Sequence, residues 1–72
     1  MKFAYGDEVK LRTKDDAGTV AEKPCAVVSI TPVESEEQAR HLKRPVGTIL
    51  YTVEFNDGTD ALVTEADLQP LD

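Results

Sequence analysis

The alternation of apolar and polar side chains in residues 49–55 is the feature that most constrains the fold of this chain. Every second residue there is apolar or aromatic, which predicts a strand with one buried face. The turn sequence Asn-Asp-Gly follows at residues 56–58, and a second strand-like run occupies residues 60–63. We therefore predict a β-hairpin in which Gly58 adopts the left-handed conformation.

Further strands are predicted on either side of this hairpin. Residues 7–12 also alternate, and residues 25–30 are rich in β-branched side chains, which indicates a central strand that ends near Pro32. Residues 69–71 predict a brief edge strand. The intervening residues 13–24 are polar and lack periodicity, so we expect a long surface loop there, the one most typical of a functional loop.

Two short helical segments are predicted between these strands. In residues 35–43, Ser35 and Gln38 have the spacing of a capping box, acidic residues come first and basic residues last. Pro45 disfavours further helix, so this segment is a surface element in a connection. Residues 64–68 predict one helical turn, with Thr64 as its cap.

The order of these elements predicts an all-β fold with one domain over residues 1–72. Five short strands are expected to form a small SH3-like barrel, with one short helix inserted between strands 2 and 3 and a one-turn helix before the last strand. A chain of 72 residues is too short for two domains, and strands and helices do not alternate as in a parallel sheet.

Residues suited to catalysis or metal binding are scarce. Cys25 is the single cysteine and opens an apolar strand, where a free cysteine is usually a small buried hydrophobe. His41 is the single histidine, and helical spacing turns it towards solvent. Neither has the partners that a nucleophile or a metal site requires. We therefore expect a non-enzymatic protein without a cofactor or a metal.

The charge of the chain is distributed unevenly. The net charge is -6, yet residues 1–44 contain equal numbers of acidic and basic residues, and residues 45–72 contain acidic residues only. This asymmetry predicts an acidic surface that repels nucleic acid and suits a protein partner with a basic site. The residues expected to form that surface are Glu54, Asp57, Asp60, Glu65 and Asp67.

Four segments of the chain carry a family resemblance: residues 6–9, 45–55, 57–58 and 63–68. Together they resemble a family of small bacterial SH3-like proteins, the immunity proteins of polymorphic toxin systems. In that family a Glu-Glu-Gln-Ala helix also precedes a Pro-Val-Gly-Thr segment. The resemblance implies that the protein binds and blocks a cognate toxin, and it assigns no contact residues.

Two other functions remain open from the sequence. The chain could be a general interaction or accessory module of SH3-like fold, which binds a peptide between residues 13–24 and residues 56–58. Nucleic-acid binding ranks below this, because it would require the basic residues to gather into one patch. Those residues are Lys10, Arg12, Lys14 and Lys23 on one side and Arg40, Lys43 and Arg44 on the other.

The sequence also bears on location. Its apolar runs are far shorter than the ~20 residues that span a bilayer, and the first residues lack the apolar core of a signal peptide. We expect a cytoplasmic protein that does not enter a membrane.

Overall fold

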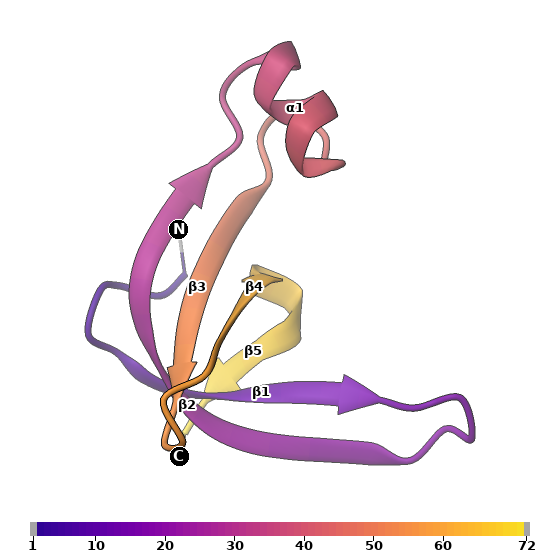
Figure 1. Ribbon diagram of the computed structural model, residues 1–72, viewed down its shortest axis with the longest axis vertical. Helices are drawn as coiled ribbons and strands as arrows, with labels where there is room; N and C mark the ends of the chain where they lie inside the picture. The colour runs from indigo at the N-terminus through magenta and orange to yellow at the C-terminus, as the bar shows by residue number, and fades with distance from the viewer. Residues whose placement is uncertain (1, 72) are drawn as a thin grey trace.

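The computed structural model describes residues 2–71 and consists mainly of β-strands (Figure 1). One α-helix and one 3₁₀ turn interrupt the strands, as the sequence predicted. None of the described helices has the length and apolar character needed to cross a membrane. In chain order the elements are β1 (Glu8–Lys14), β2 (Val20–Pro32), α1 (Glu36–Leu42), β3 (Ile49–Phe55), β4 (Asp60–Thr64), the 3₁₀ turn η1 (Glu65–Asp67) and β5 (Leu68–Pro70).

The strands form one antiparallel sheet in the order β4-β3-β2-β1-β5. The long strand β2 joins its two halves: its first part pairs with β1 and its second part with β3. Only Cys25 and Ala26 have a partner on both sides. The strand bends in this region, and a bulge follows between Val27 and Ser29. Within residues 2–71 the end strands β4 and β5 do not pair with each other, so the bent sheet is not closed.

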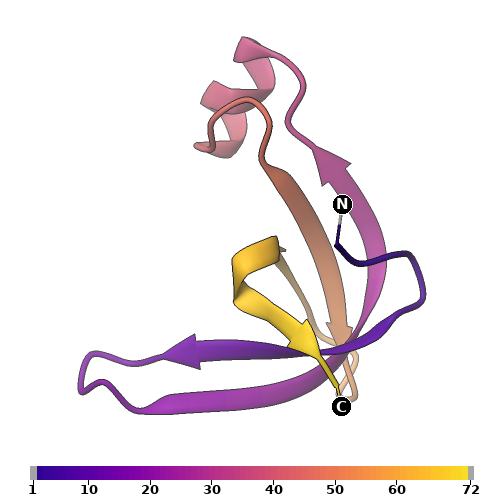
Figure 2. The ribbon, with the colours of Figure 1, turned by 180° about the vertical axis from the view of Figure 1, so that it is seen from behind.

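The prediction of a long loop at residues 13–24 is wrong. β1 continues to Lys14 and pairs residue by residue with β2, which begins at Val20. Only a tight turn separates them, in which Asp15 Oδ1 accepts hydrogen bonds from the backbone N–H groups of Ala17 and Thr19, both at 2.9 Å. Residues 12–23, here called the arm, therefore form a two-stranded ribbon that projects from the rest of the sheet (Figures 1 and 2).

The helix prediction is confirmed at both ends. The hydroxyl of Ser35 accepts a hydrogen bond from the N–H of Gln38 at 3.2 Å, and the Gln38 side chain accepts one from the N–H of Glu34 at 2.8 Å. Lys43, with φ of 57°, takes the left-handed conformation that ends α1 before Pro45. No residue of α1 is fully buried, so the helix covers little of the core.

The predicted hairpin is formed by β3 and β4. Gly58 has φ of 85°, and the N–H of Phe55 donates to the carbonyl of Thr59 across the turn at 2.8 Å. η1 confirms the predicted helical turn, although β5 begins at Leu68, one residue before the predicted strand.

The core lies on one face of the bent sheet. Tyr51 and Val53 of β3 are completely buried there, and Cys25 is only 7% exposed, as predicted for a small buried hydrophobe. The Phe3 ring packs edge-on against the Tyr51 ring, with the centroids 5.7 Å apart. The remaining buried members of this cluster are Val9, Leu11, Val27 and Leu68.

Candidate functional site

The five acidic residues predicted to form a binding surface occupy two separate elements. Glu54, Asp57 and Asp60 lie on or beside the β3–β4 turn, and all three are exposed. Glu65 and Asp67 lie in η1 and are half-buried. The two groups therefore differ in burial and in the side chains around them.

Glu65 is bound to the interior of the protein. Its Oε2 accepts a hydrogen bond from the buried hydroxyl of Tyr51 at 2.6 Å and another from the backbone N–H of Lys2 at 3.0 Å. The Tyr51 hydroxyl bond chiefly lowers the pKa of Glu65, and the Lys2 bond adds to this. Burial, followed by the carboxylate of Glu65, raises the pKa of Tyr51. Glu65 therefore fastens the N-terminal segment to β3.

Asp67 also has a structural partner. Its Oδ2 accepts hydrogen bonds from the backbone N–H of Thr64 at 3.1 Å and from the Thr64 hydroxyl at 2.9 Å. These bonds satisfy donors at the start of η1 that would otherwise lack an acceptor. The carboxylate is thus committed to the turn that leads into β5.

Asp57 is partly engaged. Its Oδ1 accepts hydrogen bonds from the Thr59 hydroxyl at 2.6 Å and the Thr59 N–H at 3.0 Å, and these bonds lower its pKa. Its Oδ2 lies 4.0 Å from the ammonium of Lys23, which itself sits 4.3 Å from the centre of the Phe55 ring. Asp57 shapes the hairpin turn and is partly neutralised by a neighbouring base.

Glu54 and Asp60 differ from these three because their carboxylates form no hydrogen bond or ion pair with any described residue. They are direct cross-strand partners on β3 and β4, so their side chains leave the same face of the sheet about 5 Å apart at Cβ. Two like charges in this position repel each other, which weakens the hairpin.

The register of the sheet adds Glu8, a residue that the sequence reasoning missed. Glu8 pairs with Ala26, and Ala26 pairs with Glu54. Directly opposed residues share a face, so β1, β2, β3 and β4 place Glu8, Ala26, Glu54 and Asp60 in one line across the sheet. We call the three carboxylates of Glu8, Glu54 and Asp60 the acidic row. In the sequence, the alternation in residues 7–12 indicated only that Glu8 lies on the exposed face of its strand.

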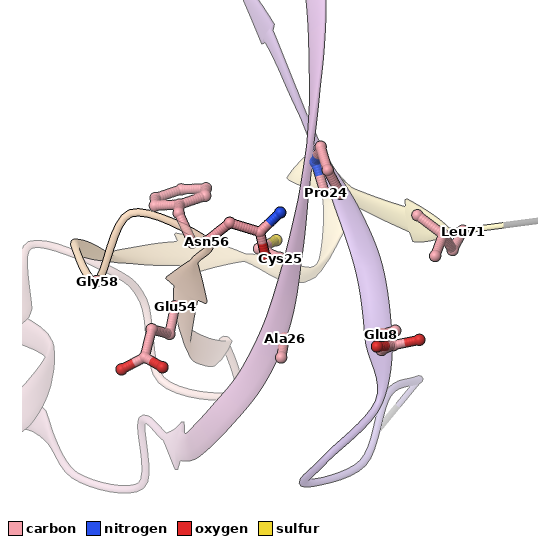
Figure 3. Close-up of a pocket in the computed structure, with 9 residues that line it drawn as sticks. Glu8, Pro24, Cys25, Ala26, Glu54, Asn56, Gly58 and Leu71 are labelled. Carbon is pink, nitrogen blue, oxygen red and sulfur yellow. The ribbon is translucent and has the colours of Figure 1, made fainter.

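A hollow of about 440 Å³ lies beside the acidic row. Ala26, with its single methyl group, separates the two glutamates of the row, which stand on either side of it (Figure 3). The space can admit a long cationic side chain, and a carboxylate on each side could form charge-assisted hydrogen bonds with it. The lining residues are Glu8, Pro24, Cys25, Ala26, Glu54, Phe55, Asn56, Gly58 and Leu71.

The residues with nucleophilic or basic side chains lie apart from one another. Burial raises the pKa of the Cys25 thiol, which disfavours the reactive thiolate. His41 is exposed on α1, as predicted, whereas Cys25 is buried in β2. Among the described residues no cluster of His, Cys, Asp and Glu has the arrangement needed to hold a metal ion.

The basic residues are also divided. Lys10, Arg12, Lys14 and Lys23 lie on the β1–β2 hairpin, whereas Arg40, Lys43 and Arg44 lie on or next to α1 (Figure 1). These two elements extend from different ends of the molecule, so the bases do not form a single patch.

No protein-family model, no curated protein and no solved structure matches the chain.

Proposed function

We propose that this protein is a non-enzymatic immunity protein that neutralises a bacterial toxin by covering a basic site on it with the acidic row. The observation that carries the proposal is the alignment of Glu8, Glu54 and Asp60 across neighbouring strands, beside a hollow. The resemblance of the sequence to immunity proteins supplies the class of partner. We also propose that the bent five-stranded sheet is an SH3-like barrel that is open between β4 and β5.

The repulsion within the acidic row supports a binding role. Like charges placed directly opposite one another cost stability, and Glu54 and Asp60 have no internal cation to offset that cost among the described residues. A basic partner would remove the repulsion and gain attraction at the same time. Complementary charge would also accelerate the encounter and exclude partners of the wrong sign.

The proposal narrows the surface that the sequence suggested. Glu54 and Asp60 remain the main candidates, with Glu8 added and Asp57 at the margin. Glu65 and Asp67 are left out of the proposed binding surface, since their carboxylates already bind Tyr51 and Thr64.

The test is binding to the toxin domain encoded beside this protein's gene. Co-expression should protect cells, and the purified proteins should associate more slowly as the salt concentration rises. Glu54→Lys should weaken binding by more than about tenfold, because it places two cations together in the interface.

Glu34→Lys is the matched control. It makes the same change of charge at an exposed side chain beside α1, away from the acidic row. Equal losses from Glu34→Lys and Glu54→Lys would show that only net charge matters. A failure of co-expression to protect cells would remove the proposed function itself.

A further inference from the structure

β1 is longer than the strand that covers its outer edge. β1 pairs with β2 from Glu8 to Lys14, but with β5 only from Val9 to Leu11. Residues 12–14 therefore have a neighbouring strand on one side only. In Figure 2 β1 continues beyond β5 towards the tip of the arm.

The register identifies the backbone groups that are left open. Lys10 is opposite Pro24, which has no N–H group, so the hydrogen-bonding groups of Lys10 must point to the other side, where Gln69 of β5 is its partner. In an antiparallel ladder this direction repeats every second residue. The pairing of Leu11 with Leu68 turns the N–H of Arg12 towards the carbonyl of Asp67, just before β5. The groups left open at the outer edge are therefore the C=O of Arg12 and the N–H and C=O of Lys14.

A second hollow, of about 550 Å³, lies along this edge. Four consecutive residues of β1, residues 11–14, line this hollow. Because consecutive side chains of a strand point to opposite faces, the hollow must extend around the edge of β1. Apolar side chains from β1, β4 and η1 form part of its wall. The lining residues are Leu11, Arg12, Thr13, Lys14, Val20, Val63, Ala66 and Asp67.

The charges at this hollow are mainly positive and unpaired. Arg12 and Lys14 form no ion pair with a described residue, in contrast to Lys10, which lies 3.5 Å from Glu22. Asp67 is the one acidic residue in the lining, and its Oδ2 is held by Thr64. A second copy of this chain, paired through the same edge, would bring these cations together, so the charge favours an acidic occupant.

We propose that the outer edge of β1 at Arg12–Lys14 binds an extended, acidic segment of a partner protein as an additional strand. Arg12 and Lys14 point to one face of the sheet and Leu11 to the other. The segment should therefore alternate carboxylate side chains, which face the two cations, with apolar side chains, which face Leu11 and Val63. This site shares no lining residue with the hollow beside the acidic row, so it is independent of the proposed function.

The experiment uses the full chain labelled with ¹⁵N and the peptide acetyl-Glu-Val-Glu-Val-Glu-amide. Binding should shift the amide resonances of residues 12–14 and slow the exchange of the Lys14 N–H with solvent, because that N–H gains an acceptor. A peptide with Lys in place of Glu, and one with an N-methyl group on the central backbone nitrogen, should bind more weakly. Shifts confined to the acidic row or to α1 would overturn the proposal.

Two variants with the same change of charge distinguish binding at the edge of β1 from a general effect of net charge on peptide affinity. Lys14→Glu should reduce peptide affinity by about tenfold, as expected for replacing attraction by repulsion at one contact. Arg44→Glu makes the same charge change at an exposed position beyond α1 and should have little effect. Equal losses in the two variants would overturn the site. So would concentration-dependent dimerisation that protects the Lys14 N–H without peptide, since the occupant would then be a second copy.

Discussion

The hydroxyl oxygen of Tyr51 forms hydrogen bonds with parts of the chain that are distant in the sequence. Its hydroxyl accepts hydrogen bonds from the backbone N–H groups of Lys2 and Phe3, at 3.2 and 3.3 Å, and donates one to Glu65. The side chain is completely buried. The N-terminal segment, β3 and η1 thus meet at one oxygen atom.

Tyr51→Phe is expected to lower the free energy of unfolding by about 1–3 kcal/mol, because it leaves a buried N–H group without an acceptor. Urea denaturation should show a lower midpoint with an unchanged slope. Tyr5→Phe is the control, since the Tyr5 side chain is 76% exposed. Equal effects in the two variants would mean that the buried hydroxyl contributes nothing special.

Glu65 should make stability depend on acid pH. Its pKa in the folded protein is lowered from the ordinary value of 4.5, chiefly by the Tyr51 hydroxyl. A lowered folded-state pKa stabilises the fold fully above the unfolded-state value, and this contribution is lost as the pH falls through the folded-state value.

Glu65→Gln should therefore be less stable than the parent at neutral pH, and the difference should shrink as the pH falls below 4.5. Denaturation curves at a series of pH values from neutral to acid would measure it. Glu34→Gln, at an exposed site, should show no such convergence. A difference for Glu65→Gln that stays constant into the acid range would contradict this assignment.

At the scale of elements, the sequence predicted the strands and turns in which buried and exposed side chains follow the period of the local structure. The β3–β4 hairpin was predictable because Tyr51 and Val53 in the alternating run are completely buried, Glu54 in the same run is exposed, and Gly58 has the expected positive φ. The arm was not, because most of its residues are exposed on both faces and no apolar alternation remains to reveal a strand. The acidic row was only half predictable, since placing Glu8 beside Glu54 requires the register of three strands.

The arm should depend on its turn more than on its strands, because a two-stranded ribbon with little burial is marginally stable. Asp15→Ala removes the acceptor for Ala17 and Thr19. Amide exchange of Thr13 and Ala21 should become roughly fivefold faster, the equivalent of about 1 kcal/mol, while Val53 in the core is unaffected. Asp16→Ala, at an exposed position in the same turn, is the control. Equal acceleration in both variants would contradict a specific role for Asp15.

At the scale of the whole molecule, the sequence located the charge asymmetry but did not predict which of the acidic side chains are free at the surface and which are bonded within the fold. Two of the five acidic residues that the sequence selected, Glu65 and Asp67, form hydrogen bonds within the protein. The bond to Glu65 comes from the hydroxyl of Tyr51, which is distant in the sequence, so the acidic pattern alone could not reveal it. The prediction of five antiparallel strands in an all-β fold is confirmed, but β4 and β5 do not pair within residues 2–71, so the predicted closure into a barrel is not observed. Whether the two end strands pair depends on how far β2 bends, and no local sequence pattern encodes that bend.

The pairing of β1 with β5 has a consequence for the folding pathway. Every other strand pair joins neighbours in the sequence, but this one brings the two ends of the chain together. The entropy lost in closing so long a loop is recovered only after the local hairpins have formed, so β5 should dock after the transition state.

Leu68→Val, at a side chain only 2% exposed, should cost about 1 kcal/mol and act almost entirely on the unfolding rate. In stopped-flow measurements the refolding limb would coincide with that of the parent, and the unfolding limb would rise. A slower refolding limb would place β5 in the nucleus instead. On this pathway β5, the shortest strand, docks last and detaches first, so its contacts largely determine the unfolding rate and with it the lifetime of the native state.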